Sequence, residues 1–295
     1  MSRTAPDTVA RSAPARRPAR RLPVGGLVAY AVLVVLAVVY VFPFLIQVAN
    51  AFKTDGDATA DPLDLLPLPG TTAAFTTLFT QLDFPRAAMN SAVVAVAVTL
   101  GRVFFDCLAG YALARLPFRG RGLVFAGFVA VIAVPPVVLL IPKFLVLNQL
   151  GIYDSYAGMI VPLMADAGGV FIMKSFFESV PRSVEEASYL DGAGTFRTFW
   201  SIVLPMARPA VVTITILSFQ ASWNELSHFV VSRSSPDLNT LTTLVATLTS
   251  GGAFGQANQY PLKLAAAALM TIPVAVLFFV FQRQVMAGTE GAVKE

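Results

Sequence analysis

Six long apolar stretches dominate the sequence, at residues 24–48, 88–114, 122–147, 156–178, 207–231 and 262–284. Each is close to the roughly 20 residues that an α-helix needs to cross the hydrocarbon core of a bilayer. Backbone amides and carbonyls cannot stay unpaired in lipid, so each stretch is predicted to be a helix. Only 13% of the residues are charged and 56% are hydrophobic, which is too little charge to cover a soluble domain. The sequence therefore predicts an all-α integral membrane protein with six transmembrane helices.

The segments outside these stretches are short. Residues 1–23 are rich in Ala, Arg and Pro, and we expect them to form a disordered, basic cytoplasmic tail. The six helices would occupy residues 24–285, and residues 286–295 would form a cytoplasmic C-terminal tail. Ala49-Asn50-Ala51 matches a signal-peptidase site, but the apolar run before it is far longer than the about 7–15 residues of a signal peptide. We interpret that run as a retained helix.

Lysine and arginine residues favour one orientation. The basic connections carry Arg115, Arg119 and Arg121 after the second stretch, and Arg182, Arg197 and Arg208 between the fourth and the fifth. The alternate connections, residues 49–87, 148–155 and 232–261, are acidic or nearly free of basic groups. Because basic connections stay in the cytoplasm, both termini are predicted to be cytoplasmic. The net charge of +4 gathers in the N-terminal tail beside an apolar stretch, which argues against a nucleic-acid partner.

The sequence gives little basis for catalysis. The single histidine, His228, and the single cysteine, Cys107, cannot build a zinc site or an internal disulfide. No lysine follows a glycine, so the chain lacks the Gly-Lys pair with which a P-loop binds phosphates. Neither a Ser/His/Asp set nor paired acids are visible in the connections. We expect a transport subunit that is not an enzyme and needs no metal or cofactor.

The connection between the fourth and fifth stretches, residues 181–205, carries the most information. Ser183 and Glu186 have the spacing of a capping box, and Gly192 is a candidate stop for the helix that they would begin. A second short helix is expected around Thr195–Val203, ending at Pro205. Its large aromatic side chains are expected to pack on the membrane helices: Phe196, Phe199 and Trp200. The residues alone leave two interpretations, a docking element for a partner protein or an amphipathic helix lying on lipid.

The same segment resembles the EAA motif of ABC importer permeases. The matching residues are Glu186, Ala187, Gly192, Ile202, Leu204 and Pro205. Ser188 departs from the motif, because it stands where a second alanine is usual. The resemblance implies a coupling helix that docks on a separate ATPase subunit. It implies that the contact involves Glu185, Glu186, Ala187, Asp191, Gly192, Ala193, Leu204 and Pro205.

Further motifs narrow the resemblance to the second permease of carbohydrate importers of the maltose and glycerol-3-phosphate type. They are Asn90-Ser91, Tyr111–Arg115, Trp223-Asn224-Glu225 and the C-terminal Gly291–Lys294. This resemblance implies the type I permease fold in a bacterial plasma membrane. It also implies a second permease, two ATPase subunits, an extracytoplasmic solute-binding protein and a sugar substrate. An ion-coupled carrier, although no three-helix repeat is visible, and an ABC permease for another solute remain the alternatives.

Polar residues inside the apolar stretches are candidates for the translocation path, because they should face protein or water rather than lipid. The candidates are Asp166, Gln220, Trp223, Asn224 and Glu225. Arg102 and Asp106 lie four residues apart on one face of the second helix. They are interpreted either as a self-neutralising pair or as part of the path. The connection 232–261 is expected to contact the binding protein.

Overall fold

The computed structural model describes residues 24–249 and 259–292, and within these ranges it is helical with no β-strand. The predicted N-terminal tail and residues 250–258 of the predicted external connection lie outside the described residues. The chain divides into two compact units, residues 1–45 and 46–295. Most of α1 (Val24–Ala51) belongs to the first unit, and its last turns belong to the second. All the contacts that follow lie within the second unit.

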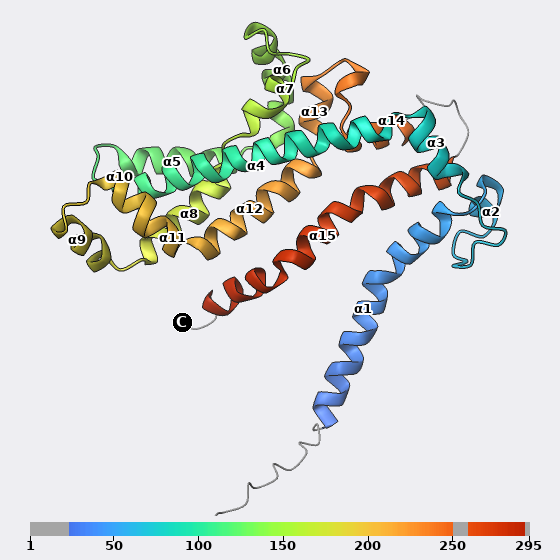
Figure 1. Ribbon diagram of the computed structural model, residues 1–295, viewed down its shortest axis with the longest axis horizontal. Helices are drawn as coiled ribbons and strands as arrows, with labels where there is room; N and C mark the ends of the chain where they lie inside the picture. Colours follow the sequence, from blue (N-terminus) through green and yellow to red (C-terminus); the bar gives the residue numbers. More distant parts are fainter. Residues whose placement is uncertain (1–23, 250–258, 293–295) are drawn as a thin grey trace, which may run out of the picture. The chain divides into compact units, whose positions relative to one another are not determined.

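The second unit is built around α4 (Phe84–Arg115), a helix of 32 residues. At a rise of about 1.5 Å per residue it is about 48 Å long, longer than the hydrocarbon core of a bilayer. It packs along α8 (Ala167–Ser179) and α12 (Arg208–Trp223), and α12 packs in turn on α15 (Tyr260–Ala292) (Figure 1). α15 continues past residue 285, where the helical region was expected to end.

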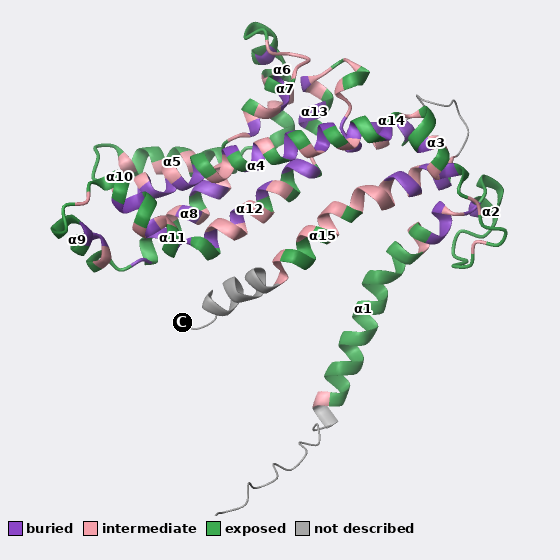
Figure 2. Ribbon diagram, viewed as in Figure 1, coloured by how far each residue is buried: buried purple, intermediate pink, exposed green. Residues whose placement is uncertain are grey.

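Two glycines of α4 permit its close approach to the neighbouring segment. A Cβ atom at Gly110 would lie 2.7 Å from the Cβ atom of Met173, and one at Gly101 would lie 2.8 Å from the side chain of Met164. Small residues at such crossings let membrane helices pack backbone to backbone. Buried residues therefore concentrate on α4, whereas α5 (Arg121–Ile132) has none (Figure 2).

The third and fourth apolar stretches are not continuous helices. After α5 the chain bends by 97° at Pro135 and Pro136 before α6 (Leu140–Gln149), because proline interrupts helical hydrogen bonding. The fourth stretch is divided into α7 (Tyr156–Ile160), a 3₁₀ turn at Val161–Leu163 and α8. These two stretches, each predicted to be a helix, are therefore interrupted at these points.

The fifth stretch is also interrupted. α12 ends at Trp223, and α13 (Ser227–Ser232) follows after a break. The expected external connection then contains α14 (Leu241–Thr249), whose Leu241 and Leu244 are buried in the core. This part of the connection is thus packed into the fold rather than being a free loop.

The connection before α4 also contains short helices, α2 (Asp55–Ala60) and α3 (Ala73–Gln81). Among the described residues, four helices are long and apolar enough to cross a membrane, and the number is six if each of two bent pairs of helices is counted as one span. Four of the six apolar stretches correspond to single candidate spans, and the third corresponds to the bent pair α5–α6. The fifth begins with α12, which is the second half of the other bent pair, Thr195–Met206 and Arg208–Trp223.

Candidate functional site

The candidate site is the helical connection between α8 and α12, at the C-terminal end of α4 (Figure 1). Its first helix, α9 (Arg182–Leu190), ends as predicted at Gly192, whose φ is +80°. The amide of Gly192 donates to the Tyr189 carbonyl, and the amide of Ala193 donates to the Ser188 carbonyl. These two bonds form a Schellman motif, in which a left-handed residue closes the helix.

The start of α9 differs from the expectation. Pro181 is the N-cap residue and makes no side-chain capping bond, and Ser183 lies inside the first turn. The predicted capping box of Ser183 and Glu186 is therefore wrong. The physical reason is that Pro181 supplies a fixed φ just before the helix, which starts two residues earlier than it would with Ser183 as its cap.

The second half of the segment is one helical stretch with a local irregularity. It runs through α10 (Thr195–Thr198), a π-helical turn at Phe199–Val203 and α11 (Leu204–Met206). Pro205 has no amide hydrogen to donate to the preceding turn, and the wider π turn precedes it. The helix thus passes Pro205 by one residue instead of ending there, and it then bends by 80° into α12.

Only one of the three aromatic residues of this segment anchors it. Phe199 is buried, with its ring centroid 4.9 Å from that of Tyr111 on α4. Phe196 is 72% exposed and Trp200 is 52% exposed, and their rings stack on each other. The expectation that all three pack on the membrane helices is wrong for these two, whose side chains are mostly exposed; the Trp200 ring contacts Phe199, with ring centroids 6.1 Å apart.

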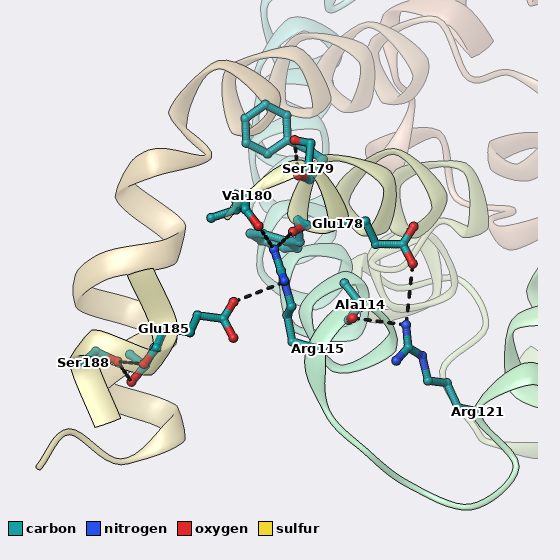
Figure 3. A network of polar contacts seen from close by, with 11 residues as sticks. Ala114, Arg115, Arg121, Glu178, Ser179, Val180, Glu185 and Ser188 are labelled. Atoms are coloured by element: carbon teal, nitrogen blue, oxygen red, sulfur yellow. Dashed lines mark hydrogen bonds and ion pairs between the residues drawn. The ribbon is translucent and has the colours of Figure 1, made fainter. Parts of the chain in front are cut away.

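Arg115, the last residue of α4, joins three elements (Figure 3). Its guanidinium donates to the carbonyls of Phe177 and Val180 at the end of α8. Its Nε atom lies 3.1 Å from Oε1 of Glu185 on α9, and both side chains are at least 90% buried. The contact is an ion pair rather than an aligned hydrogen bond. Since breaking a buried pair costs about 3–5 kcal/mol, Arg115 and Glu185 hold α9 against α4 and α8.

Ser188 joins the two halves of the segment. Its hydroxyl donates to the carbonyl of Glu185 and lies 2.8 Å from the hydroxyl of Thr198 on α10. Both side chains are buried. The departure from the usual alanine therefore adds a hydrogen bond between α9 and α10.

The predicted coupling residues differ in their exposure to solvent. Glu186, Ala187, Asp191 and Gly192 are exposed, beside Leu190, which is 89% exposed. Glu185 faces inward to Arg115, so its contribution is to position α9 and not to form the surface. Ala193 and Leu204 are partly buried, and Pro205 is exposed. The segment thus presents a polar and apolar face to a partner while its other face is fixed to the helix bundle.

The predicted path residues lie on or directly beside α8 and α12. Asp166 is the N-cap of α8, and its Oδ2 accepts from the amide of Gly169 at 2.9 Å. Gln220 and Asn224 are exposed and four residues apart on and just after α12, and Glu225 accepts from the amide of His228. Each of these polar groups lies at a helix end or break.

Trp223 is a packing residue. It is 5% exposed, stacks on Phe219 and donates its indole N–H to the carbonyl of Met270 on α15 at 3.1 Å. The ring is therefore enclosed between α12 and α15, and its one polar atom is satisfied.

The opposite end of α4 holds the segment that follows α13. Asn90 donates to the carbonyls of Asp237 and Asn239, both at 2.8 Å, and Ser91 accepts from the amide of Leu241. The Asn90-Ser91 motif thus fixes the entry to α14. Asn90 and Arg115 are 25 residues apart in one helix, which corresponds to about 38 Å.

Asp154, which lies between α6 and α7, also fixes the segment that follows α13. Its carboxylate accepts from the hydroxyl and amide of Ser235 and from the amide of Ser234, and these bonds hold the pKa of Asp154 below its usual range.

Among residues 24–249 and 259–292, no three His, Cys, Asp or Glu side chains come together in a way that could hold a metal ion.

The sequence matches a family model described as "Binding-protein-dependent transport system inner membrane component" over residues 107–289. The sulfoquinovosyl glycerol transport system permease SmoH of Agrobacterium fabrum is 31% identical over 263 residues, 88% of this chain and 91% of SmoH. The diacetylchitobiose uptake permease NgcG of Streptomyces coelicolor is 28% identical, covering 88% of this chain and 85% of NgcG. The sn-glycerol-3-phosphate permease UgpE of Yersinia pestis is 28% identical, covering 87% of this chain and 92% of UgpE.

The fold is similar to a chain in the crystal structure of a bacterial ABC transporter involved in the import of the acidic polysaccharide alginate. The TM-score is 0.75 with 22% sequence identity, over 91% of this chain and 99% of that chain. The two chains therefore share a fold along nearly their whole length.

Proposed function

The chain belongs to the family of binding-protein-dependent transport system inner membrane components, and we propose that it is one of two permease subunits of a sugar-importing ABC transporter. The observation that carries the proposal is the segment 181–206. It is anchored to α4 and α8 on one side and exposes a mixed polar and apolar surface on the other. Such a segment can transmit the movement of a separate protein to the membrane helices.

The proposed coupling surface consists of the exposed face of α9 and α10. Leu190 and Phe196 are large apolar side chains in contact with solvent, and Glu186 and Asp191 stand beside them. Exposed apolar groups rimmed by polar ones are typical of protein-binding surfaces. The partner is an ATPase subunit, because this chain has no P-loop. The pair of Arg115 and Glu185 would carry its motion into α4.

Both termini are proposed to be cytoplasmic. The basic connections around Arg115–Arg121 and Arg182–Arg208 favour the cytoplasm by the positive-inside rule. Asn90 and Arg115 are about 38 Å apart along α4, more than the about 30 Å of the hydrocarbon core. The segment held by Asn90 would then be external, on the side from which a solute arrives.

The proposed assembly contains a second permease, two ATPase subunits and an extracytoplasmic binding protein. The relatives named above are permeases for sulfoquinovosyl glycerol, diacetylchitobiose and sn-glycerol-3-phosphate, so a sugar or sugar derivative is the substrate class that they support. The connection 232–261 would contact the binding protein. Asp166, Gln220, Asn224 and Glu225 would supply hydrogen-bonding groups along the path.

The proposal is tested by reconstitution into liposomes with the proposed ATPase, permease and binding-protein partners. Uptake of radiolabelled sugars is expected to require ATP and the binding protein. The variant Arg115→Met should abolish uptake, because it leaves the carboxylate of Glu185 buried without its partner. Uptake that follows an ion gradient and needs no ATP would overturn the proposal.

A further inference from the structure

Arg102 and Asp106 do not pair with each other, contrary to the interpretation of a self-neutralising pair. No ion pair joins them within the part of the chain that the structure describes; both side chains bond instead to backbone atoms beyond α4. Nε of Arg102 donates to the carbonyl of Leu163 at 2.8 Å. The amide of Asp166 donates to Oδ1 of Asp106 at 3.0 Å.

These two backbone atoms are among those that the break before α8 leaves without helical partners. The backbone at Asp166 is extended, with φ −135° and ψ 124°. In an unbroken helix the Leu163 carbonyl would accept from residue 167, and the Asp166 amide would donate to residue 162. Unpaired backbone groups inside a membrane protein are costly, so a neighbour must bond to them. Arg102 and Asp106 lie one helical turn apart on α4. Arg102 bonds to the Leu163 carbonyl, and Asp106 bonds to the Asp166 amide.

The carboxylate of Asp106 is buried and packed closely against Gly169 of α8. Asp106 is fully buried, and a Cβ atom at Gly169 would lie 2.0 Å from its Oδ2. That Oδ2 atom has no hydrogen-bond partner. A buried oxygen without a partner destabilises the folded state, so an apolar side chain would serve better if packing were the only role. The contact with the Asp166 amide is the contribution that an apolar side chain cannot make.

We propose that Arg102 and Asp106 are positioning residues that hold the break at Leu163–Asp166 against α4, so that α4 and α8 move as one rigid body in the transport cycle. Arg102 and Arg115 lie 13 residues apart on α4, about 20 Å. Arg115 fixes the C-terminal end of α8 to α4, and Asp106 fixes its N-terminal end. A movement received at α9 would therefore reach Asp166 without being absorbed by sliding between α4 and α8. The inference rests on the proposed function.

Two matched pairs of variants test it. In Arg102→Gln the side-chain nitrogen occupies the place of Nε and can donate to the Leu163 carbonyl. The Met side chain of Arg102→Met is as long as that of Gln but has no donor. In Asp106→Asn an oxygen acceptor remains, whereas Asp106→Leu has the same branching and no acceptor. The first pair remains decisive if Asp106→Leu does not assemble, because Arg102 is only partly buried and its stem is retained.

The readouts are the amount of solute transported per ATP hydrolysed and the distance between spin labels on α4 and α8. Labels at the exposed Met89 and Ser175, in a Cys107→Ala background, report the position of α8 relative to α4. In the parent protein the distance should be the same without nucleotide and with vanadate-trapped nucleotide. Arg102→Met and Asp106→Leu should broaden the distance distribution and lower the transport ratio about fivefold, while the Gln and Asn variants should stay close to the parent protein.

The inference is overturned if Arg102→Met keeps the parent transport ratio and the parent distance distribution. It is also overturned if the distance changes between the two nucleotide states of the parent protein, because α4 and α8 would then not be one body. Failure of the proposed function gives a different result, since the parent complex would show no ATP-dependent uptake although the label distances could still be measured.

Discussion

Single polar side chains connect the elements of the coupling segment. Arg115 bonds to two carbonyls of α8 and pairs with Glu185 of α9, and Ser188 bonds to Thr198 of α10. All four of these side chains are buried. Buried polar groups that find partners across elements fix one arrangement of those elements, because each lost partner leaves a costly unpaired atom.

Removal of one hydroxyl of the Ser188–Thr198 pair should loosen the segment. Ser188→Ala leaves the buried Thr198 hydroxyl without this partner and should cost about 1–2 kcal/mol locally. Amide hydrogen exchange in α9 and α10 should then accelerate about tenfold, because exchange follows local opening. In Ser188→Ala/Thr198→Val neither hydroxyl remains. Amide hydrogen exchange in the double variant should therefore accelerate less than the two single variants together predict. Strictly additive effects would show that the two hydroxyls do not interact.

Sequence reasoning found part of this site at the residue scale. Gly192 and Glu186 were identified from the spacing of the motif, and the structure places both at the exposed turn of α9. From the sequence, Arg115 is a basic residue of a predicted cytoplasmic connection and the last residue of the motif Tyr111–Arg115, but its contacts are not predicted. Its partners are the Glu185 side chain, 70 residues away in the sequence, and carbonyls of α8, and no local pattern encodes such contacts. A signal was present, since Arg115 ends the motif Tyr111–Arg115.

At the scale of elements, hydropathy predicted where helices lie but not where they break. The long apolar runs became α1, α4 and α15, whereas three others are interrupted before α6, α8 and α13. Pro135 and Pro136 explain the first break. At the break before α8, two backbone groups bond to side chains of α4, and a single-stretch pattern does not reveal these bonds because they come from another helix.

The turn after α9 gives a prediction for an element boundary. Gly192 has a φ of +80° and open space around its position, so the cost of a side chain there is conformational and about 1–2 kcal/mol. Gly192→Val should uncouple ATP hydrolysis from sugar uptake, and Gly192→Asn should do so less. Gly194, with a φ of −78° and equally open surroundings, is the matched control, and Gly194→Ala should transport normally. Normal uptake by Gly192→Val would count against the role of this turn.

At the scale of the molecule, α4 makes contacts at both of its ends, which are proposed to lie on opposite sides of the membrane. Its C-terminal end contacts α9 through Arg115, and its N-terminal region binds the entry to α14 through Asn90 and Ser91. The six-span composition and the all-α fold could be predicted from hydropathy, because lipid restricts the backbone to helices. The folding of the segment 232–249 back into the core could not, because its threonines and short apolar runs resemble an ordinary loop.

The orientation is tested with reporter fusions at residue 70 and at the C-terminus. Residue 70 lies between α2 and α3, in the acidic connection that the positive-inside rule places outside. A periplasmic reporter such as alkaline phosphatase should be active at residue 70 and inactive at the C-terminus. A cytoplasmic reporter should give the reverse pattern. Activity of the same reporter at both positions would be incompatible with six spans and cytoplasmic termini.

The central claim is that the exposed face of α9 binds a separate ATPase subunit, and a site-specific crosslink tests it most directly. In a Cys107→Ala background, Leu190→Cys places a thiol at a side chain that is 89% exposed, and Leu68→Cys places one at a side chain that is 81% exposed in the proposed external connection. A short thiol-to-amine crosslinker is applied to the assembled, transport-active complex. It should join the cysteine of Leu190→Cys to the ATPase subunit, and it should not join the cysteine of Leu68→Cys to that subunit. An active complex in which Leu190→Cys gives no crosslink to the ATPase, or in which Leu68→Cys gives one, would contradict the account.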